Sequence, residues 1–170
     1  MKIKILNESG HSEALLGVSL SYNKTPSPEA IITLSHKDGG HNKFLESIVL
    51  WLDITAPRYW WQQFDTYRIS VTKQSESTMH TLKGHTFTPE DFETWIPLEL
   101  IAILNQYKDQ PELKGMLPES FLQRRIVCTN YKTLRNIFKQ RRTHRLIEWN
   151  IFIESVYNAV RVNEYLEDCV

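Results

Sequence analysis

The sequence predicts an α+β fold, and three observations lead to this prediction. Segments with helical spacing and short β-branched segments alternate irregularly, with no internal repeat. Hydrophobic residues make up 41% and charged residues 24% of the chain, a balance typical of globular proteins. A length of 170 residues suits one core. We therefore expect a single domain over residues 1–170, with helices packed on a small antiparallel or mixed sheet.

Local signals place the elements of the first half. Ser27 as N-cap, followed by Pro28 at the first helical position, marks a helix start. Pro57 ends a β-branched strand and can open the next helix. The expected elements are strands over residues 2–6 and 47–55, helices over residues 12–21, 28–38 and 58–64, and a polar turn or short helix over residues 41–47.

In the second half, a helix start at Thr88 and helical apolar spacing predict one helix that runs through Pro97 to Leu104. Asn130 or Thr129 is suited to cap a helix that ends near Arg141. The remaining expectations are a strand over residues 124–129, a final helix over residues 142–160, and an apolar face formed by Leu134, Ile137 and Phe138.

Charge is unevenly distributed although the net charge is zero. No acidic residue lies between Glu119 and Glu148, and this window attracts anions. A solvated helix face is one interpretation, and a nucleic-acid surface is weaker because the rest of the chain is acidic. The basic residues of the window are Arg124, Arg125, Lys132, Arg135, Lys139, Arg141, Arg142 and Arg145.

A phosphate pocket is a second interpretation of this window. Asn130 at a helix N-terminus could act with Arg124 before the helix and Arg141 at its end, since helix N-termini and arginines both bind phosphate. Asn130 and Arg141 are eleven residues apart, which returns to nearly the same helix face. The alternative is that Asn130 only caps the helix and the arginines pair with surface carboxylates.

Other chemistries find little support in the sequence. The six histidines lack metal-ligand spacing, no phosphate-binding glycine motif occurs, and Ser75, Ser77 and His80 have no acidic partner in register. Cys128 and Cys169 lie far apart, so we expect reduced thiols. The first residues lack a signal-peptide pattern and no stretch could span a membrane, which predicts a cytoplasmic protein without a membrane partner.

Several blocks resemble the flavin-dependent thymidylate synthases over about residues 40–156. The segment with Gly40, His41, Phe44, Leu45 and Glu46 resembles the family's G-H-x-x-x-F-E-H block. A second block carries Leu117, Pro118, Arg124, Asn130, Leu134 and Arg141 without a gap. The final helix, with Glu148 and Trp149 near its start, is also similar.

This resemblance implies a fold, ligands and site residues. It implies FAD as cofactor, a pyrimidine nucleotide such as dUMP as ligand, and a homotetramer with sites between subunits. Trp60 and Trp61 would then lie in the core or near a subunit interface. The implied nucleotide-binding residues are Gln63, Arg68, Ser75, Glu76, Ser77, Arg124 and Arg141, and the implied cofactor-binding residues are Tyr67, Asn130, Lys132 and Asn136.

The family's signature R-H-R-x-x-S-x-N-x-x-S-x-R is altered here. Arg68 is kept, and the other signature positions become Thr66, Tyr67, Val71, Lys73, Glu76 and Thr78. Lost arginines remove the fixed positive charge on which electrostatic catalysis depends. The sequence therefore predicts a nucleotide-binding protein with a degraded signature, and the alternative is an active flavin-dependent transferase acting on dUMP. The tryptophan pair and the STMH stretch are similar to those of phage proteins, which suggests a phage origin.

Overall fold

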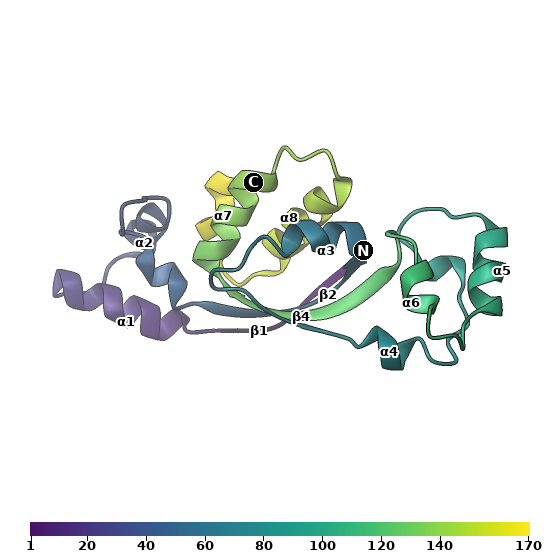
Figure 1. The fold of residues 1–170 in the computed structure, drawn as a ribbon. Coiled ribbons are helices and arrows are strands. Elements are labelled where there is room, and N and C mark those ends of the chain that lie inside the picture. The colour runs from purple at the N-terminus through teal and green to yellow at the C-terminus, as the bar shows by residue number, and fades with distance from the viewer.

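A computed structural model describes all residues, 1–170. Its centre is an antiparallel sheet of four strands in the order β1-β2-β4-β3 (Figure 1). The strands are β1 (Lys2–Ser9), β2 (Val49–Pro57), β3 (Thr72–Ser75) and β4 (Leu122–Asn130). Helices pack on this sheet, so the predicted α+β class is confirmed. The strands expected near residues 2–6, 47–55 and 124–129 are present, and β3 was not predicted.

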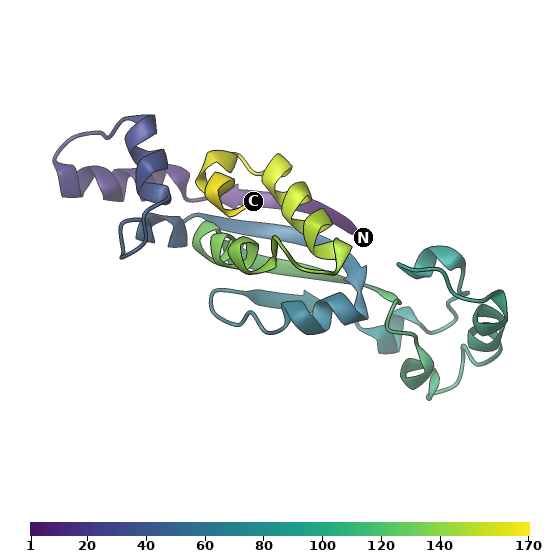
Figure 2. The same ribbon diagram turned by 90° about the horizontal axis from the view of Figure 1, so that it is seen from above.

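Strand alternation divides the sheet into a covered face and an open face. On β2, Leu50, Leu52, Ile54 and Ala56 are fully buried, whereas Trp51 between them is exposed. Three helices lie over the covered face, namely α3 (Arg58–Phe64), α7 (Tyr131–Arg141) and α8 (Ile147–Ala159), and Figures 1 and 2 show all three on the same side of the strands. The open face carries no helix.

Aromatic side chains form the core between the sheet and these helices. Trp60, Trp61, Phe64 and Trp149 are fully buried and pack as a cluster, with the ring centroids of Trp60 and Trp149 4.9 Å apart. The expected burial of Leu134, Ile137 and Phe138 on α7 is confirmed. The tryptophan pair lies in the core, one of the two positions expected for it, because α3 turns both indoles onto the covered face of the sheet.

The segment between β1 and β2 forms a helical extension at one end of the sheet (Figure 2). It contains α1 (His11–Tyr22), α2 (Pro28–Ser35) and the 3₁₀ helix η1 (Lys43–Glu46). The predicted cap is confirmed, since the Ser27 hydroxyl accepts a hydrogen bond from the backbone N–H of Ala30 at 3.3 Å. The turn after α2 uses Gly39 and Gly40, both at positive φ.

A lobe at the opposite end of the sheet joins β3 to β4 (Figure 2). It has its own cluster of eight buried apolar residues. The prediction of one helix through Pro97 is wrong. Thr88 and Asp91 form a capping box around one turn of 3₁₀ helix. A new helix starts after Pro97, because proline lacks the N–H that a continuous helix needs at that position. The elements of the lobe are α4 (Thr78–Thr81), η2 (Pro89–Asp91), α5 (Leu98–Gln106) and α6 (Leu113–Met116).

The chain ends in a 3₁₀ helix, η3 (Asn163–Cys169), that packs against α7. Both cysteines are free, and burial raises the pKa of the Cys169 thiol to about 12. None of the helices combines the length and the apolar character that crossing a membrane requires.

Candidate functional site

A chain of polar contacts begins beneath the loop between α7 and α8. The side-chain oxygen of Gln63 accepts a hydrogen bond from the Trp149 indole N–H at 2.8 Å and another from Nη1 of Arg141 at 3.3 Å. The Nε of Arg141 also donates to the Tyr67 hydroxyl at 2.8 Å. Two residues predicted to bind a nucleotide and one predicted to bind a cofactor therefore touch one another.

The chain of contacts continues from Tyr67 along α7. The Tyr67 hydroxyl donates to Oε1 of Gln140 at 3.1 Å, and Nε2 of Gln140 donates to Oδ1 of Asn136 at 3.0 Å. Asn136 and Gln140 are one helical turn apart, so their side chains meet on the same face of α7. Asn136, also predicted to bind a cofactor, is thereby connected to Arg141.

Aromatic rings hold Arg141 in place. Its guanidinium carbon lies 4.6 Å from the ring centroid of Trp149 and 5.5 Å from that of Tyr67, which places the cation over both rings. Burial, together with the positive charge of Arg141, lowers the pKa of the nearby His144 imidazole. A neutral His144 leaves Arg141 as the positive charge of this cluster.

A cavity of about 780 Å³ adjoins this cluster, between α7 and the segment Thr66–Ile69. Three cationic side chains in its lining, Arg68, Lys132 and Lys139, make the cavity strongly positive. The carboxylate in the lining is that of Asp38. Asp38 lies 3.7 Å from Lys132 and 3.9 Å from Lys139 and is largely exposed. The lining residues are Asp38, Thr66, Tyr67, Arg68, Ile69, Lys132, Thr133, Arg135, Asn136, Lys139 and Gln140.

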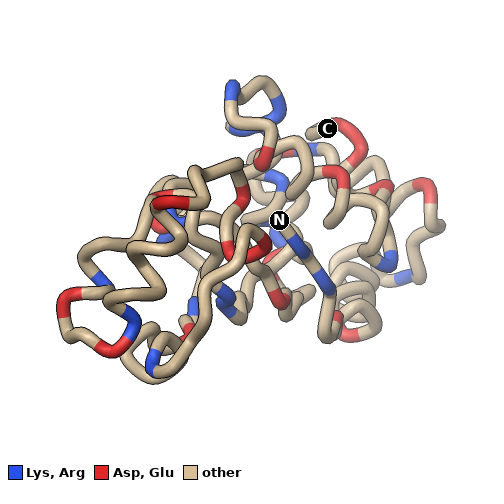
Figure 3. The backbone as a smooth tube through the Cα atoms, turned by 90° about the vertical axis from the view of Figure 1, so that its right-hand side faces the viewer, with Lys and Arg blue, Asp and Glu red and all other residues tan.

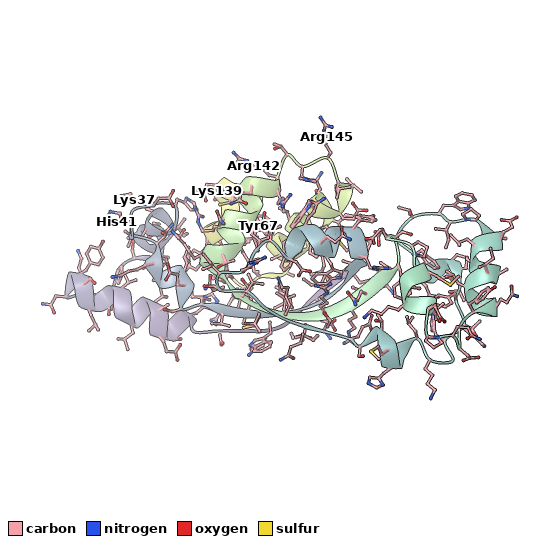
Figure 4. The ribbon with its side chains drawn as sticks, in the orientation of Figure 1. Lys37, His41, Tyr67, Lys139, Arg142 and Arg145 are labelled. Atoms are coloured by element: carbon pink, nitrogen blue, oxygen red, sulfur yellow. The ribbon has the colours of Figure 1, made fainter.

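Further basic residues lie on the same side of the molecule. Figure 4 shows Tyr67 and Lys139 on the upper side together with Lys37, His41, Arg142 and Arg145. Arg142 and Arg145 are exposed and form no ion pair, and in Figure 3 the loop at the top of the molecule carries Lys or Arg positions. The basic window of the sequence thus contributes to a positive surface around the cavity.

Asn130 has the capping role that its position suggested. It is 7% exposed, and its side-chain oxygen accepts the backbone N–H of Thr133 at 2.9 Å. It does not line the cavity, although Lys132 and Thr133 in the next turn do. The amino group of Lys132 donates to Oδ1 of Asn42, which fixes it at the rim.

Arg124 lies on the open face of the sheet, away from Arg141. It forms two hydrogen bonds with the Asp53 carboxylate, at 2.8 and 2.6 Å, and these hold the pKa of Asp53 below its ordinary value. Glu76 accepts the backbone N–H of Arg124 at 2.9 Å. The alternative in which arginines pair with surface carboxylates therefore describes Arg124, and the phosphate pocket of Asn130, Arg124 and Arg141 does not form within one chain.

The hydroxyl-rich stretch occupies a third position. Ser75 ends β3 and Ser77 precedes α4, and both line a separate cavity of about 350 Å³ together with Glu76, Arg58 and Gln123. Ser75, Glu76 and Ser77 were expected to bind the nucleotide, but they lie along a strand and the start of a helical turn, outside the larger cavity. The preceding segment, Thr66–Ile69, does line the larger cavity.

Sequence reasoning missed several residues of the site. Lys139 and Gln140 lie on the cavity side of α7, and their spacing from Lys132 and Asn136 was the available signal. Asp38 had no signal, because it comes from the turn after α2. Trp149 was noted only for the resemblance of the final helix, and its hydrogen bond to Gln63 joins positions 86 apart in the chain.

Comparison with known proteins identifies the fold. No family model matches the sequence, and no curated protein matches it. Two crystal structures of thymidylate synthase X (ThyX) from Helicobacter pylori, both containing FAD and dUMP, superpose with TM-scores of 0.79 and 0.80 at 17% identity. The alignments cover 99% and 100% of both chains. The chain therefore has the fold of a flavin-dependent thymidylate synthase, as the sequence resemblance predicted.

Proposed function

We propose that this chain is a nucleotide-binding protein on a thymidylate synthase-like scaffold, and that the cavity beside α7 holds FAD or a related anionic nucleotide. One observation carries the proposal. Tyr67, Arg68, Lys132 and Asn136, each assigned to ligand binding from the sequence, line a single cavity although they come from two distant segments. The fold shared with proteins crystallised with FAD and dUMP supports it.

The residues of the cavity fit such a ligand. Its volume of about 780 Å³ lies within the range of small-molecule sites, roughly 300–1,000 Å³. Arg68, Lys132 and Lys139 would hold phosphate groups through charge-assisted hydrogen bonds, and Asn136 would bind polar atoms of the rings. A bound flavin would supply hydride or electron transfer, which no side chain here provides.

A homo-oligomer follows from the same proposal. Gln63 and Arg141 lie on the helical side of the sheet, whereas Arg124, Ser75 and Ser77 lie on its open face or at its edge. One chain cannot place both groups around one nucleotide. A second copy could supply the missing group, and we propose a homotetramer, to be tested by light scattering at several protein concentrations. We retain the cytoplasmic location and the phage origin as predictions from the sequence.

The ligand is tested on the purified chain. The protein is denatured, released small molecules are identified by mass spectrometry, and FAD is then titrated calorimetrically. We expect saturable binding that weakens about tenfold in Lys132→Gln, since a charge-assisted hydrogen bond is lost. Lys37→Gln is the matched control, because Lys37 is exposed and lies outside the cavity lining. No released nucleotide and no heat with FAD, dUMP or a purine nucleotide would refute the proposal.

Catalysis by a flavin-dependent transferase is a second candidate, favoured by the direct contact between Arg141 and Tyr67. This contact joins a residue assigned to the nucleotide with one assigned to the flavin. The test is thymidylate formation from dUMP, measured by mass spectrometry with FAD, a reductant and a one-carbon donor. Binding of both ligands without product would leave the binding function and remove the transferase.

A further inference from the structure

One dipeptide of the chain joins an aspartate to a glycine. Asp38 and Gly39 stand in the turn after α2, and every other aspartate and asparagine is followed by a residue that has a Cβ atom. The side-chain carboxyl carbon of an aspartate can reach the backbone nitrogen of the next residue, and a Cβ on that residue hinders the approach. Glycine has no Cβ and moves easily between backbone conformations, so these two groups can meet readily.

The turn leaves both groups accessible. The Asp38 side chain is 74% exposed, and the hydrogen bond that it accepts from the Asn42 amide is long, at 3.4 Å. Gly39 is exposed, and its backbone N–H makes no hydrogen bond within the chain. At the Cβ position of Gly39 no heavy atom of a non-neighbouring residue lies within 4 Å. The fold therefore neither covers these two groups nor fixes the nitrogen.

Asp109 is another exposed aspartate in a turn, and there the next nitrogen is fixed. The backbone N–H of the following residue, Gln110, donates to the backbone oxygen of Tyr107 at 2.9 Å. An attack by this nitrogen on the Asp109 carboxyl group would break that hydrogen bond, and the Gln110 side chain would hinder it. Asp109 thus provides an internal reference for the reactivity of Asp38.

The reaction at Asp38 needs only water. The backbone nitrogen of Gly39 loses its proton and bonds to the side-chain carboxyl carbon, whose hydroxyl group leaves with a proton as water. The product is a cyclic succinimide, lighter by one water molecule. Water then adds to either ring carbonyl. If the bond from nitrogen to the original main-chain carbonyl carbon breaks, the backbone runs through the side chain and the residue is isoaspartate. If the new bond breaks, aspartate is restored.

We propose that Asp38 and Gly39 form a site of spontaneous covalent modification, at which aspartate becomes isoaspartate at the rim of the cavity beside α7. Isoaspartate keeps the charge and the mass of aspartate, but Cβ enters the backbone and the free carboxylate is attached directly to Cα. The carboxylate then reaches less far toward Lys132 and Lys139, which lie 3.7 and 3.9 Å from it in the unmodified residue. Figure 4 shows Lys139 on the same side of the molecule as Lys37, which precedes the dipeptide.

Resting on the proposed nucleotide function, this modification regulates the cavity. Asp38 supplies the carboxylate of the lining and faces two cations that a phosphate group needs. Its withdrawal frees Lys132 and Lys139, so an aged chain should bind an anionic ligand more tightly than a newly made one. Exposed ion pairs are weak and screened by salt, so the gain should be greatest at low salt.

Ageing of the purified chain tests the modification without any ligand. The chain is kept in neutral buffer for several weeks and digested with an endoprotease that cleaves before aspartate but not before isoaspartate. We expect cleavage before Asp38 to decline while cleavage before Asp109 persists, and electron-transfer fragmentation to locate the isoaspartate. A synthetic peptide of residues 32–44 gives the rate without a fold. Cleavage before Asp38 that persists in the aged chain would overturn the proposal, and a decline in the peptide alone would show that the fold protects the site.

Two glycine variants separate the chemistry from the shape of the turn. Gly39→Ala adds a Cβ beside the attacking nitrogen and should slow isomerisation several-fold. Gly40→Ala is the matched control, because Gly40 also has a positive φ and open space at its Cβ position but does not supply the nitrogen. Asp38→Glu keeps the carboxylate and should suppress the reaction, because a larger ring would have to form. Equal slowing in both alanine variants would assign the effect to the turn and overturn the role of Gly39.

FAD titrations separate this inference from the proposed function. The isomerised chain is purified by chromatography and compared with the unmodified chain at low salt, where we expect it to bind FAD several-fold more tightly. Equal affinities would overturn the effect on the cavity. No FAD binding by either form would refute the proposed function and leave the modification intact, whereas undiminished cleavage before Asp38 after ageing would refute the modification alone.

Discussion

The guanidinium group of Arg135 on α7 donates two hydrogen bonds to the carboxylate of Asp168 in η3. One of them joins Nη2 to Oδ2 at 2.7 Å. Arg135 is 2% exposed, whereas the Asp168 side chain is about one-third exposed. The same guanidinium donates to the backbone oxygen of Tyr165. One buried cation thus attaches the end of the chain to the helix that lines the candidate cavity.

This pair predicts a loss of stability in acid. Burial alone raises the pKa of Asp168, but the hydrogen bond and charge of Arg135 outweigh it and lower the pKa to about 2. The stabilisation is therefore complete above the ordinary aspartate pKa and disappears as the pH falls from about 4 to 2. Asp168→Asn should lower the free energy of unfolding at pH 7 by about 1–2 kcal/mol, discounted for solvent exposure. Urea titrations at pH 7 and pH 2 check this, and a difference that persists at pH 2 would contradict it.

Two adjacent tryptophans with equal burial should differ in their contribution to stability. The Trp61 indole N–H donates to the backbone oxygen of Gln123 at 2.9 Å, and the Arg125 guanidinium lies 4.4 Å from the Trp61 ring centroid. The indole nitrogen of Trp60 makes no hydrogen bond. Trp61→Phe should therefore cost about 1–2 kcal/mol more than Trp60→Phe, measured by chemical denaturation. A larger loss of stability in Trp60→Phe would show that ring packing, and not the indole hydrogen bond, determines the contribution of each tryptophan.

Arg141 should contribute to ligand binding far more than its neighbour Arg142. Arg141 is held by Gln63 and Tyr67 beside the cavity, whereas Arg142 is exposed and unpaired. Arg141→Ala should weaken nucleotide binding by about 1.5–3 kcal/mol, the value of a charged hydrogen bond. Calorimetry on both alanine variants provides the comparison. Equal effects would indicate general attraction by the basic surface, and an unchanged affinity in Arg141→Ala would exclude this residue from the site.

Asp38 should act as a weak internal competitor of an anionic ligand. It lies within 4 Å of Lys132 and Lys139 at the rim of the cavity, and a phosphate needs the same cations. Asp38→Asn should strengthen FAD binding about two- to fivefold at low salt, since exposed pairs are weak and screened. Titrations at 20 and 300 mM salt should show the advantage shrinking. Weaker binding in Asp38→Asn would mean that Asp38 supports the ligand.

The sequence predicted α7 well because its signals are local. Asn130 supplies a cap, and the spacing of the apolar residues gives the helix a face that must be buried. The prediction of one helix through Pro97 failed because the missing N–H of the proline outweighed the apolar periodicity of the segment. Both the success and the failure depend on residues within one or two turns of each other.

The roles of the two adjacent arginines on β4 were harder to predict, because strand register decides which face each side chain occupies. Arg124 and Arg125 are neighbours, yet β4 directs Arg124 to Asp53 on the open face and Arg125 to Asp65 beside the core. A one-residue change of register would exchange them. The contacts of Gln63 with Arg141 and Trp149 join residues about eighty positions apart in the sequence, so no local pattern could predict them.

The strand order has a consequence for synthesis on the ribosome. β1 and β2 can pair as soon as both have emerged, but β2 must wait for β4, which is made last of the four strands. During that interval the backbone edge of β2, with its row of apolar residues, is open to other nascent chains. Slow translation between residues 57 and 122 would therefore lower the yield of native protein, and chaperone binding in that window would raise it.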